Sequence, residues 1–389
     1  MRLYSCLPNG EQIGQSSPLR NKTMELMQAS NQWASRPNDE RFTSLHDLAD
    51  HCQSQRDNSR QAVLSSRAFH AAPVEDDNNG LVLIGPKGNP VLPSNWSFGQ
   101  MAARADCPVG YMRRLPAPIA ADCINWGLRN RDVEEVGILL RKDNTSPIAS
   151  LGAMTGPNYG RIWNNEIAHA LVRRFGDGIT GDFRVPGEFG EQVEVNKSNT
   201  TLYASDRDMF VFLADEQNRI EVPNRRDGKS GEMARGFFVW NSEVGSSTFG
   251  VATFLFDYVC CNRIVWGAQG FKEIRLRHTS GAPNRFIEQV APALERMAHA
   301  ETHSITDAIA AAKAKRLGDQ DEVNEFLAKR FSKSEVKAIN FAMFVDEQRP
   351  IETLWDATCA VTAYARSIEW QDERVELERK GGAIMALAQ

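Results

Sequence analysis

The sequence predicts an α+β fold, in which a polar N-terminal arm precedes a mixed or antiparallel sheet with flanking helices and a helical C-terminal region. Three observations predict this fold. Residues 1–93 are rich in Gln, Asn, Ser, Asp and Pro and contain few bulky apolar side chains. Residues 94–285 mix helical and strand-like apolar patterns, and helical periodicity dominates residues 286–389. We therefore divide the chain into an arm, an α+β core and a helical region.

The arm carries the weakest local signals. Short helices are expected over residues 43–52 and 56–68. Residues 81–92 predict two strands joined by a Gly-Pro turn, because apolar runs flank the sequence GPKG. An arm of this composition suits wrapping around a neighbouring chain or extending into solvent.

The core begins with helical patterns over residues 94–126. Two strands are expected at EVGILLRK and PIASLGAM, with the turn DNTS between them. A helical stripe follows in NYGRIWNNEIAHALVRRF, and two strands that bend at SDRD are expected in TTLYASDRDMFVFLA. In the C-terminal region, Ser332 and Glu335 have the spacing of a capping box, which predicts the start of a helix.

Residues 240–260 form the densest apolar run of the chain and predict a central hairpin. Alternate side chains of a strand point to opposite faces of the sheet. The even positions then form one unbroken apolar face, whereas the odd positions mix apolar Val251 and Leu255 with polar Thr253. We expect the even face to be buried in the main core.

Composition and charge exclude several classes of protein. The chain has 389 residues, a net charge of -5 and a pI near 5.9, so the molecule as a whole does not attract nucleic acid or acidic membranes. We find no apolar run long enough to span a membrane and no signal peptide. The seven cysteines include no CxxC pair, and we expect them to pack as small core residues in a reducing cytoplasm.

The common catalytic patterns are absent from the sequence. It contains no GxxxxGK[ST], no GxGxxG after a strand, no GxSxG and no HExxH. His46, His51 and Cys52 lie close together, but their spacing is not that of a standard zinc module. We therefore predict no cofactor, no metal site and no catalytic residue.

Basic residues gather between residues 261 and 285, where Glu273 is the only acid. Strand alternation places Arg275 and Arg277 on one face and His278 on the other. A row of guanidinium groups suits phosphate oxygens, and nearby aromatic rings suit stacking on unpaired bases. The alternative is a basic face that pairs with acids of the C-terminal helices. The predicted nucleic-acid contacts are Arg263, Lys272, Arg275, Arg277, His278 and Arg285, with Trp266 and Phe271 for stacking, and a second basic group of Arg113, Arg114, Arg173 and Arg174.

Several segments of the chain resemble a family of phage- and plasmid-borne proteins. They are NQWASRPNDERFTSLHDL, NWSFGQMAARADCPVGYMRRLP, NYGRIWNNEI, NSEVGSSTFGVATFLFDYVCCN and TLWDATCAVTAYAR. The chain is similar over residues 32–385 to the family called domain of unknown function nine-thirty-two, most specifically at residues 33–37 and 241–245. This resemblance implies a mobile-element protein in a bacterial cytoplasm, and it carries over no catalytic residues.

The chain also resembles, more distantly, the single-strand-annealing recombinases of phages, of the RecT and Erf type. That resemblance implies an oligomer that holds unpaired DNA in a basic groove without hydrolysing it. The acidic pI and the long helical C-terminal region of this chain depart from that type.

These observations favour a phage- or plasmid-type protein that binds single-stranded DNA as a homo-oligomer and promotes strand annealing in recombination. Two alternatives remain open. A host-takeover or anti-defence protein would instead bind a bacterial protein through an exposed apolar patch. A metal-dependent nuclease would use carboxylates near predicted strand ends, namely Asp206, Asp208, Glu232 and Glu243.

Overall fold

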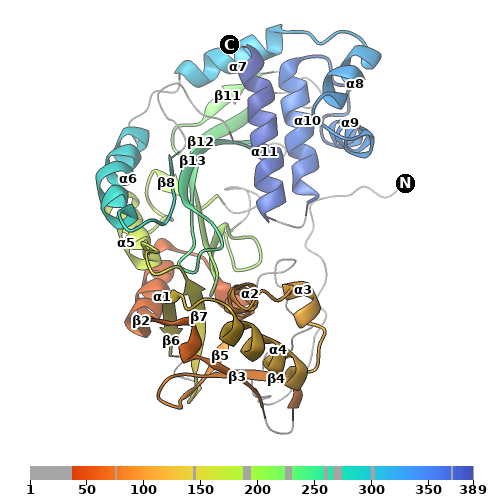
Figure 1. The fold of residues 1–389 in the computed structure, drawn as a ribbon. Helices are drawn as coiled ribbons and strands as arrows, with labels where there is room; N and C mark the ends of the chain where they lie inside the picture. Colours follow the sequence, from red (N-terminus) through yellow and green to blue (C-terminus); the bar gives the residue numbers. More distant parts are fainter. Residues whose placement is uncertain are drawn as a thin grey trace, which may run out of the picture.

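The computed structural model has an α+β architecture of two sheets with helices packed against them, as the sequence predicts (Figure 1). The smaller sheet lies in the lower half of Figure 1, and the larger sheet lies above it with the C-terminal helices. The structure describes residues 37–74, 77–142, 146–186, 194–223, 230–257, 262–265, 274–298, 303–368 and 371–388.

The smaller sheet has six strands in the order β2-β6-β7-β5-β4-β3. Neighbouring strands are antiparallel except β5 and β7, which are parallel. Helices α2, α3 and α4 cover its apolar face, where Phe98, Met101 and Ile124 are fully buried. The elements are β2 (Ser59–Ser65), β3 (His70–Val74), β4 (Asp77–Ile84), β5 (Pro90–Pro93), α2 (Asn95–Arg104), α3 (Val109–Met112), α4 (Ala117–Asn130), β6 (Glu135–Arg141) and β7 (Ala149–Thr155).

The prediction of a helix over residues 56–68 is wrong. Helix α1 (Leu45–Asp57) ends there, and β2 follows and pairs along its whole length with β6. The segment contains good helix formers such as Arg, Gln and Ala, but pairing with a neighbouring strand outweighs this local preference.

The strands predicted in residues 81–92 are confirmed as β4 and β5. They share one sheet with β6 and β7, so the predicted boundary at residue 93 falls inside the smaller sheet. Residues 1–36 of the predicted arm lie outside the described residues.

The larger sheet has nine antiparallel strands, with the central order β1-β9-β10-β12-β13-β14. Strand β8 pairs with β10, β11 with β12, and β15 with β13. Helices α1, α5 and α6 cover one face, packing against Val211, Val239 and Val251. The remaining elements are β1 (Arg41–Phe42), α5 (Asn164–Phe175), β8 (Phe183–Arg184), β9 (Leu202–Ala204), β10 (Met209–Asp215), β11 (Ile220–Val222), β12 (Gly231–Asn241), β13 (Phe249–Asp257), β14 (Asn262–Val265), β15 (Ile274–Leu276) and α6 (Ala282–Ala298).

The predicted central hairpin is confirmed as β12 and β13. The expectation that only its even face is buried is wrong. Phe254 and Phe256 on the even face and Val251 and Leu255 on the odd face are each at most 1% exposed. The reason is tertiary, because α1, α5 and α6 pack against Val251 and the C-terminal helices pack against Leu255, both on the odd face.

Two cross-strand glycines let aromatic rings lie on the neighbouring strand of this hairpin. A Cβ at Gly250 would lie 1.9 Å from the ring of Trp240, and a Cβ at Gly236 would lie 2.5 Å from the ring of Phe254. The guanidinium of Arg379, on α11, lies 5.3 Å over the Trp240 ring. The even face is therefore an aromatic layer, and Arg379 of α11 lies over two of its rings, Phe238 and Trp240.

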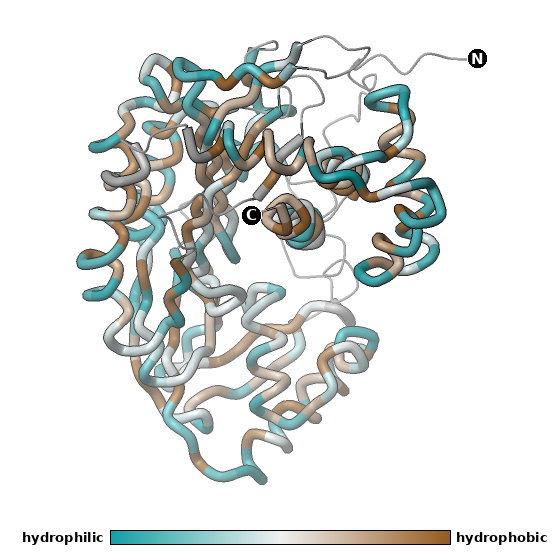
Figure 2. The backbone as a smooth tube through the Cα atoms, turned by 90° about the horizontal axis from the view of Figure 1, so that it is seen from above, coloured by the Kyte–Doolittle hydropathy of each residue, from teal (hydrophilic) through white to brown (hydrophobic). Residues whose placement is uncertain are grey.

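Helices α7 to α11 pack around Trp355 and against β11 and β14 of the larger sheet. Asp319, Ser332 and Thr353 each begin a helix with a capping box, and the box at Ser332 confirms the prediction. Hydrophilic positions lie mainly on the outward turns of the peripheral helices (Figure 2). In the part of the chain described, no helix is long and apolar enough to cross a membrane. These helices are α7 (His303–Ala314), α8 (Gln320–Ala328), α9 (Lys333–Glu347), α10 (Leu354–Arg366) and α11 (Gln371–Met385).

Candidate nucleic-acid interface

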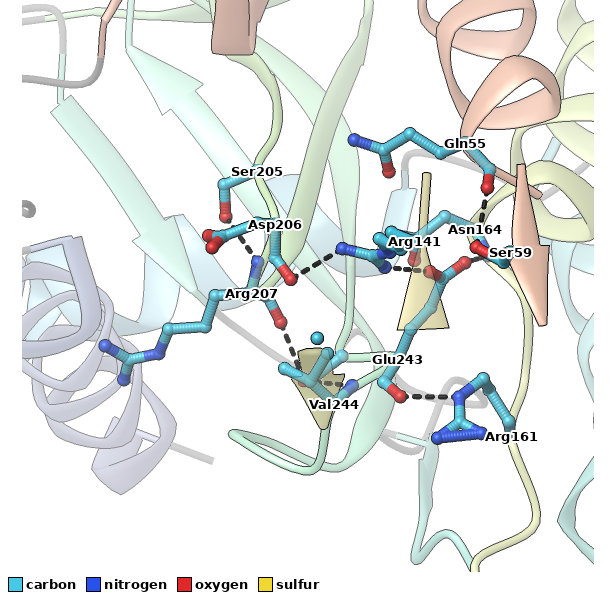
Figure 3. Close-up of polar contacts among 12 residues, drawn as sticks. Gln55, Ser59, Arg141, Arg161, Asn164, Ser205, Asp206, Arg207, Glu243 and Val244 are labelled. Atoms are coloured by element: carbon cyan, nitrogen blue, oxygen red, sulfur yellow. Dashed lines mark hydrogen bonds and ion pairs between the residues drawn. The ribbon is translucent and has the colours of Figure 1, made fainter. Parts of the chain in front are cut away.

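A buried carboxylate, Glu243, lies where the two sheets meet (Figure 3). Arg141 Nη2 donates to its Oε2 at 2.5 Å, and the backbone N–H of Asn164 donates to its Oε1 at 2.8 Å. Arg161 Nε donates to the carbonyl oxygen of Glu243 at 2.7 Å. Asn241 Nδ2 donates to the side-chain oxygen of Asn164 at 2.7 Å. We call these five residues the Glu243 junction.

The Glu243 junction fastens the two sheets to each other. Arg141 ends β6 in the smaller sheet, and its Nη1 donates to the carbonyl oxygen of Asp206, in the turn before β10 of the larger sheet, at 2.8 Å. Trp96 Nε1, on α2, donates to the carbonyl oxygen of Val244 at 3.0 Å. If Glu243 were removed, the buried guanidinium of Arg141 would have no counter-charge, which costs several kcal/mol in the free energy of unfolding. The ion pair therefore stabilises the contact between the two sheets. The motif NSEVG at residues 241–245 therefore joins the sheets.

A short segment around Gly160 connects this junction with β15. The backbone N–H of Gly160 donates to the carbonyl oxygen of His278, and His278 Nδ1 donates to the carbonyl oxygen of Gly160, both at 3.1 Å. A Cβ at Gly160 would lie 1.9 Å from the carbonyl oxygen of Thr279, so glycine is required for this close approach. The Tyr159 and His278 rings stack with their centroids 4.8 Å apart.

Strand β15 and the start of α6 present three arginines. Leu276 is buried against the core, so Arg275 points to the opposite face of the sheet, where its guanidinium lies 5.7 Å over the ring of Trp240. Arg277 follows the last residue of β15, and both arginines are exposed. Arg285, in the first turn of α6, donates from Nη2 to Thr279 Oγ1 at 2.6 Å. The N-terminus of α6 adds the partial positive charge of its N–H groups. We call Arg275, Arg277, Thr279, Arg285 and the first turn of α6 the β15–α6 corner.

His278 lies behind this corner and not on its surface. Burial, together with the positive charge of Arg161, lowers the pKa of His278 to about 4. Its Nδ1 carries the proton that is donated to Gly160, and its buried Nε2 has no hydrogen-bond partner among the described residues. The imidazole is therefore neutral near pH 7 and adds no positive charge to the corner.

Several predicted contacts cannot be placed beside the corner. Lys272, Trp266 and Phe271 lie outside the described residues. The side chain of Arg263 does too, although its backbone in β14 pairs with Phe256. The adjacent cysteines at 260–261 also lie outside the described residues.

The second basic group is divided between two parts of the fold. Arg173 and Arg174 lie in the last turn of α5, on the larger sheet. Arg113 and Arg114 follow α3, beside the smaller sheet, and Arg113 Nη2 donates to the carbonyl oxygen of Asn95 at 3.1 Å. The structure thus separates residues that the sequence suggested as one surface.

An arginine that the sequence reasoning did not select lies near Arg113. Burial and the positive charge of Arg207 lower the pKa of Arg113. The Arg207 guanidinium lies 4.6 Å over the ring of Trp96. The signal in the sequence is an arginine inside the turn SDRD, between the buried strands β9 and β10.

The carboxylates of the nuclease alternative have different partners. Glu243 belongs to the junction, and Asp208 accepts a hydrogen bond from Ser205 Oγ at 3.1 Å. Glu232 lies at the other end of β12 and pairs with Arg219 at 2.7 Å. Within the described ranges, no group of three or more His, Cys, Asp or Glu side chains is placed to hold a metal ion.

Comparison with known proteins decides the family. Residues 189–383 match the family model described as "Domain of unknown function (DUF932)". The chain belongs to this family. The match covers about half of the chain, from just before β9 to most of α11, and includes the NSEVG motif and the β15–α6 corner. It does not include the smaller sheet, although the sequence resemblance was expected to extend from residue 32.

No curated protein and no solved structure matches this chain. The chemistry of the site therefore has to be argued from its own residues.

Proposed function

We propose that this protein binds single-stranded nucleic acid and holds its phosphate backbone at the β15–α6 corner. The observation that carries the proposal is the pair of exposed arginines, Arg275 and Arg277, beside the N-terminus of α6. Guanidinium groups bind phosphate through paired hydrogen bonds, and a helix N-terminus favours an anion. Pairing of β15 with β13 fixes the backbone of Arg275, and Arg277 directly follows the end of this strand.

The support behind the corner strengthens this proposal. The two hydrogen bonds between Gly160 and His278 fix the chain that leaves β15, and the Glu243 junction fixes the segment that carries Gly160. A surface that is ordered before the ligand arrives loses less conformational entropy on binding. Because the chain as a whole is acidic, attraction to a polyanion must come from a local patch of this kind.

The preference for single strands rests on Trp266 and Phe271, which precede β15 in the sequence and suit stacking on unpaired bases. It also rests on the resemblance to strand-annealing recombinases. On this proposal the protein is borne by phages or plasmids, works in the bacterial cytoplasm, and acts as a homo-oligomer whose copies bind along one strand and promote annealing.

The test is a fluorescence-polarisation titration of the full chain with a labelled single-stranded oligonucleotide, beginning at about 50 mM salt. The double variant Arg275→Ala/Arg277→Ala should bind more weakly to every sequence. The slope of log K against log salt should become shallower by up to about two phosphate contacts. The urea midpoint of the variant should stay close to that of the parent, because both side chains are exposed and the contact of Arg275 with the Trp240 ring is worth about 1 kcal/mol at most.

A matched control removes two exposed cations elsewhere, Arg316→Ala/Lys329→Ala, and should leave the affinity nearly unchanged. Absence of saturable binding by the parent at low salt would overturn the proposal. If the two double variants lost the same amount of affinity for the oligonucleotide, net charge and not the corner would govern binding. Unfolding of the Arg275→Ala/Arg277→Ala variant would assign these arginines a structural role.

A further inference from the structure

A groove of about 800 Å³ runs between helices α8 and α9, at the outer edge of the C-terminal region (Figure 1). Three amides in it are joined, since Gln320 Nε2 donates to Asn340 Oδ1 at 3.0 Å and Asn340 Nδ2 donates to Asn324 Oδ1 at 3.1 Å. The apolar part of its lining comes from Ala328, Val336 and Phe344. Both walls are helices, whose backbone groups are already paired, so the groove offers no strand edge and suits another helix.

The α9 wall exposes an unusual amount of apolar surface. Phe341 is 67% exposed, Phe344 is 65% exposed and Val345 is 49% exposed, all within five consecutive positions. Single exposed apolar side chains are common, but two phenylalanines and a valine on one helical stripe are typical of an interaction surface.

The two walls carry opposite charges. On α9, Lys333 and Lys337 line the groove. On α8, Asp321 and Glu325 each follow a groove-lining amide by one position, which places them on the rim, and both are exposed. Glu325 also pairs with Lys329 on its own helix at 3.0 Å, a contact between exposed side chains that is worth little.

We propose that this groove is occupied by the same groove of a second copy of the chain. A two-fold axis along the groove would place α8 of each copy over α9 of the other. The acids Asp321 and Glu325 would then face Lys333 and Lys337 twice. Phe344 would lie inside the groove, and Phe341, one position after the groove-lining Asn340, would pack at its rim. Such an interface must be self-complementary. A patch with an acidic rim on α8, lysines on α9, and a groove lined by amides and by Ala328, Val336 and Phe344 meets that requirement.

The size of the patch predicts a weak, reversible dimer. Helix α9 has 15 residues and is therefore about 22 Å long, and two adjacent helices are about 20 Å wide. The buried area then falls below the roughly 1,200 Å² of a standard interface. This inference names one interface for the homo-oligomer of the proposed function and rests on that part of it. It is tested without nucleic acid, so its failure is distinguishable from a failure of nucleic-acid binding.

Sedimentation velocity of the full chain over a range of micromolar concentrations tests the dimer. The parent should shift from monomer to dimer as its concentration rises. Phe341→Ala/Phe344→Ala and Lys333→Glu/Lys337→Glu should each raise the dissociation constant about tenfold or more. A parent that stays monomeric throughout, or variants that associate like the parent, would overturn the proposal.

A mixing experiment separates loss of the interface from loss of folding. The Lys333→Glu/Lys337→Glu variant and the Asp321→Lys/Glu325→Lys variant should each be monomeric alone, because like charges then face each other. Mixed in equal amounts they should form a heterodimer, since each acidic wall again meets a basic wall. If the mixture stays monomeric, the two walls do not face each other and the inference is wrong.

Discussion

Arginine side chains have different roles in the Glu243 junction and in the β15–α6 corner. Arg141 and Arg161 are buried and bonded to Glu243, whereas Arg275 and Arg277 are exposed. A guanidinium that is removed from water loses its hydration, and a fixed carboxylate must replace it. Because Arg141 and Glu243 lie on different sheets, their ion pair fixes the two sheets relative to each other. An exposed guanidinium remains accessible to a ligand, even where, as at Arg275, it also lies over an aromatic ring. Burial, and not the residue type, therefore divides the arginines into structural and candidate binding groups.

The two regions are also mechanically connected. Arg161 bonds to Glu243, and its neighbour Gly160 bonds to His278 at the end of β15. A change at the junction should therefore reach the corner, whereas a change at the exposed arginines should not reach the junction. Three substitutions test this asymmetry.

The largest effect is expected from Glu243→Gln. This change keeps the shape of the side chain but leaves the Arg141 guanidinium without its buried counter-charge, which should cost about 3–5 kcal/mol in the free energy of unfolding. Urea denaturation monitored by fluorescence measures it. The control is Glu232→Gln, which removes the partner of Arg219 at a side chain that is 55% exposed and should cost at most about 1 kcal/mol. Similar losses in both variants would contradict a structural role for the junction.

The second prediction concerns pH and His278. Its pKa of about 4 in the folded chain lies below the ordinary value of 6.5, so the unfolded chain binds more protons between these two values. The contribution of the neutral His278 to the free energy of unfolding is fully present above pH 6.5. It is lost as the pH falls toward 4, and the loss amounts to roughly 3 kcal/mol in total. His278→Asn retains a donor for the Gly160 carbonyl but does not titrate.

The free energy of unfolding, measured at pH 7 and at pH 4, should therefore fall further for the parent than for His278→Asn. If both proteins lose the same amount, His278 is not buried in its neutral form. The comparison cancels the titration of all other groups, since only this side chain differs.

The third and smallest effect is expected from Gly160→Ala. The new methyl group would overlap the carbonyl oxygen of Thr279, so β15 and the start of α6 must shift, at about 1–3 kcal/mol. Nucleic-acid binding should weaken although no charge is removed. Gly156→Ala is the matched control, because a Cβ there meets nothing within 4 Å. Unchanged binding by Gly160→Ala in the titration described above would show that the corner does not depend on this support.

Local patterns in the sequence predict an element correctly where the residues of that segment themselves specify its structure. The capping box at Ser332, the hairpin of β12 and β13, and the strand pair β4 and β5 all follow from residues close together in the chain. The helix predicted over residues 56–68 failed because β2 is specified by its partner β6, some 70 residues away, and not by its own composition.

The candidate site shows the same division. Alternation along a strand predicts that Arg275 and Arg277 share a face, but β15 ends at Leu276, so the shared face stays a prediction. The sequence could not assign Glu243 to a buried ion pair, because Arg141 is distant in the chain and the pairing exists only when the sheets meet. It could not show that His278 is neutral, because its pKa is set by the desolvation that folding brings. Periodicity and caps are local properties of the chain, whereas burial and charge pairing arise only from long-range contacts, and the tertiary structure alone decides them.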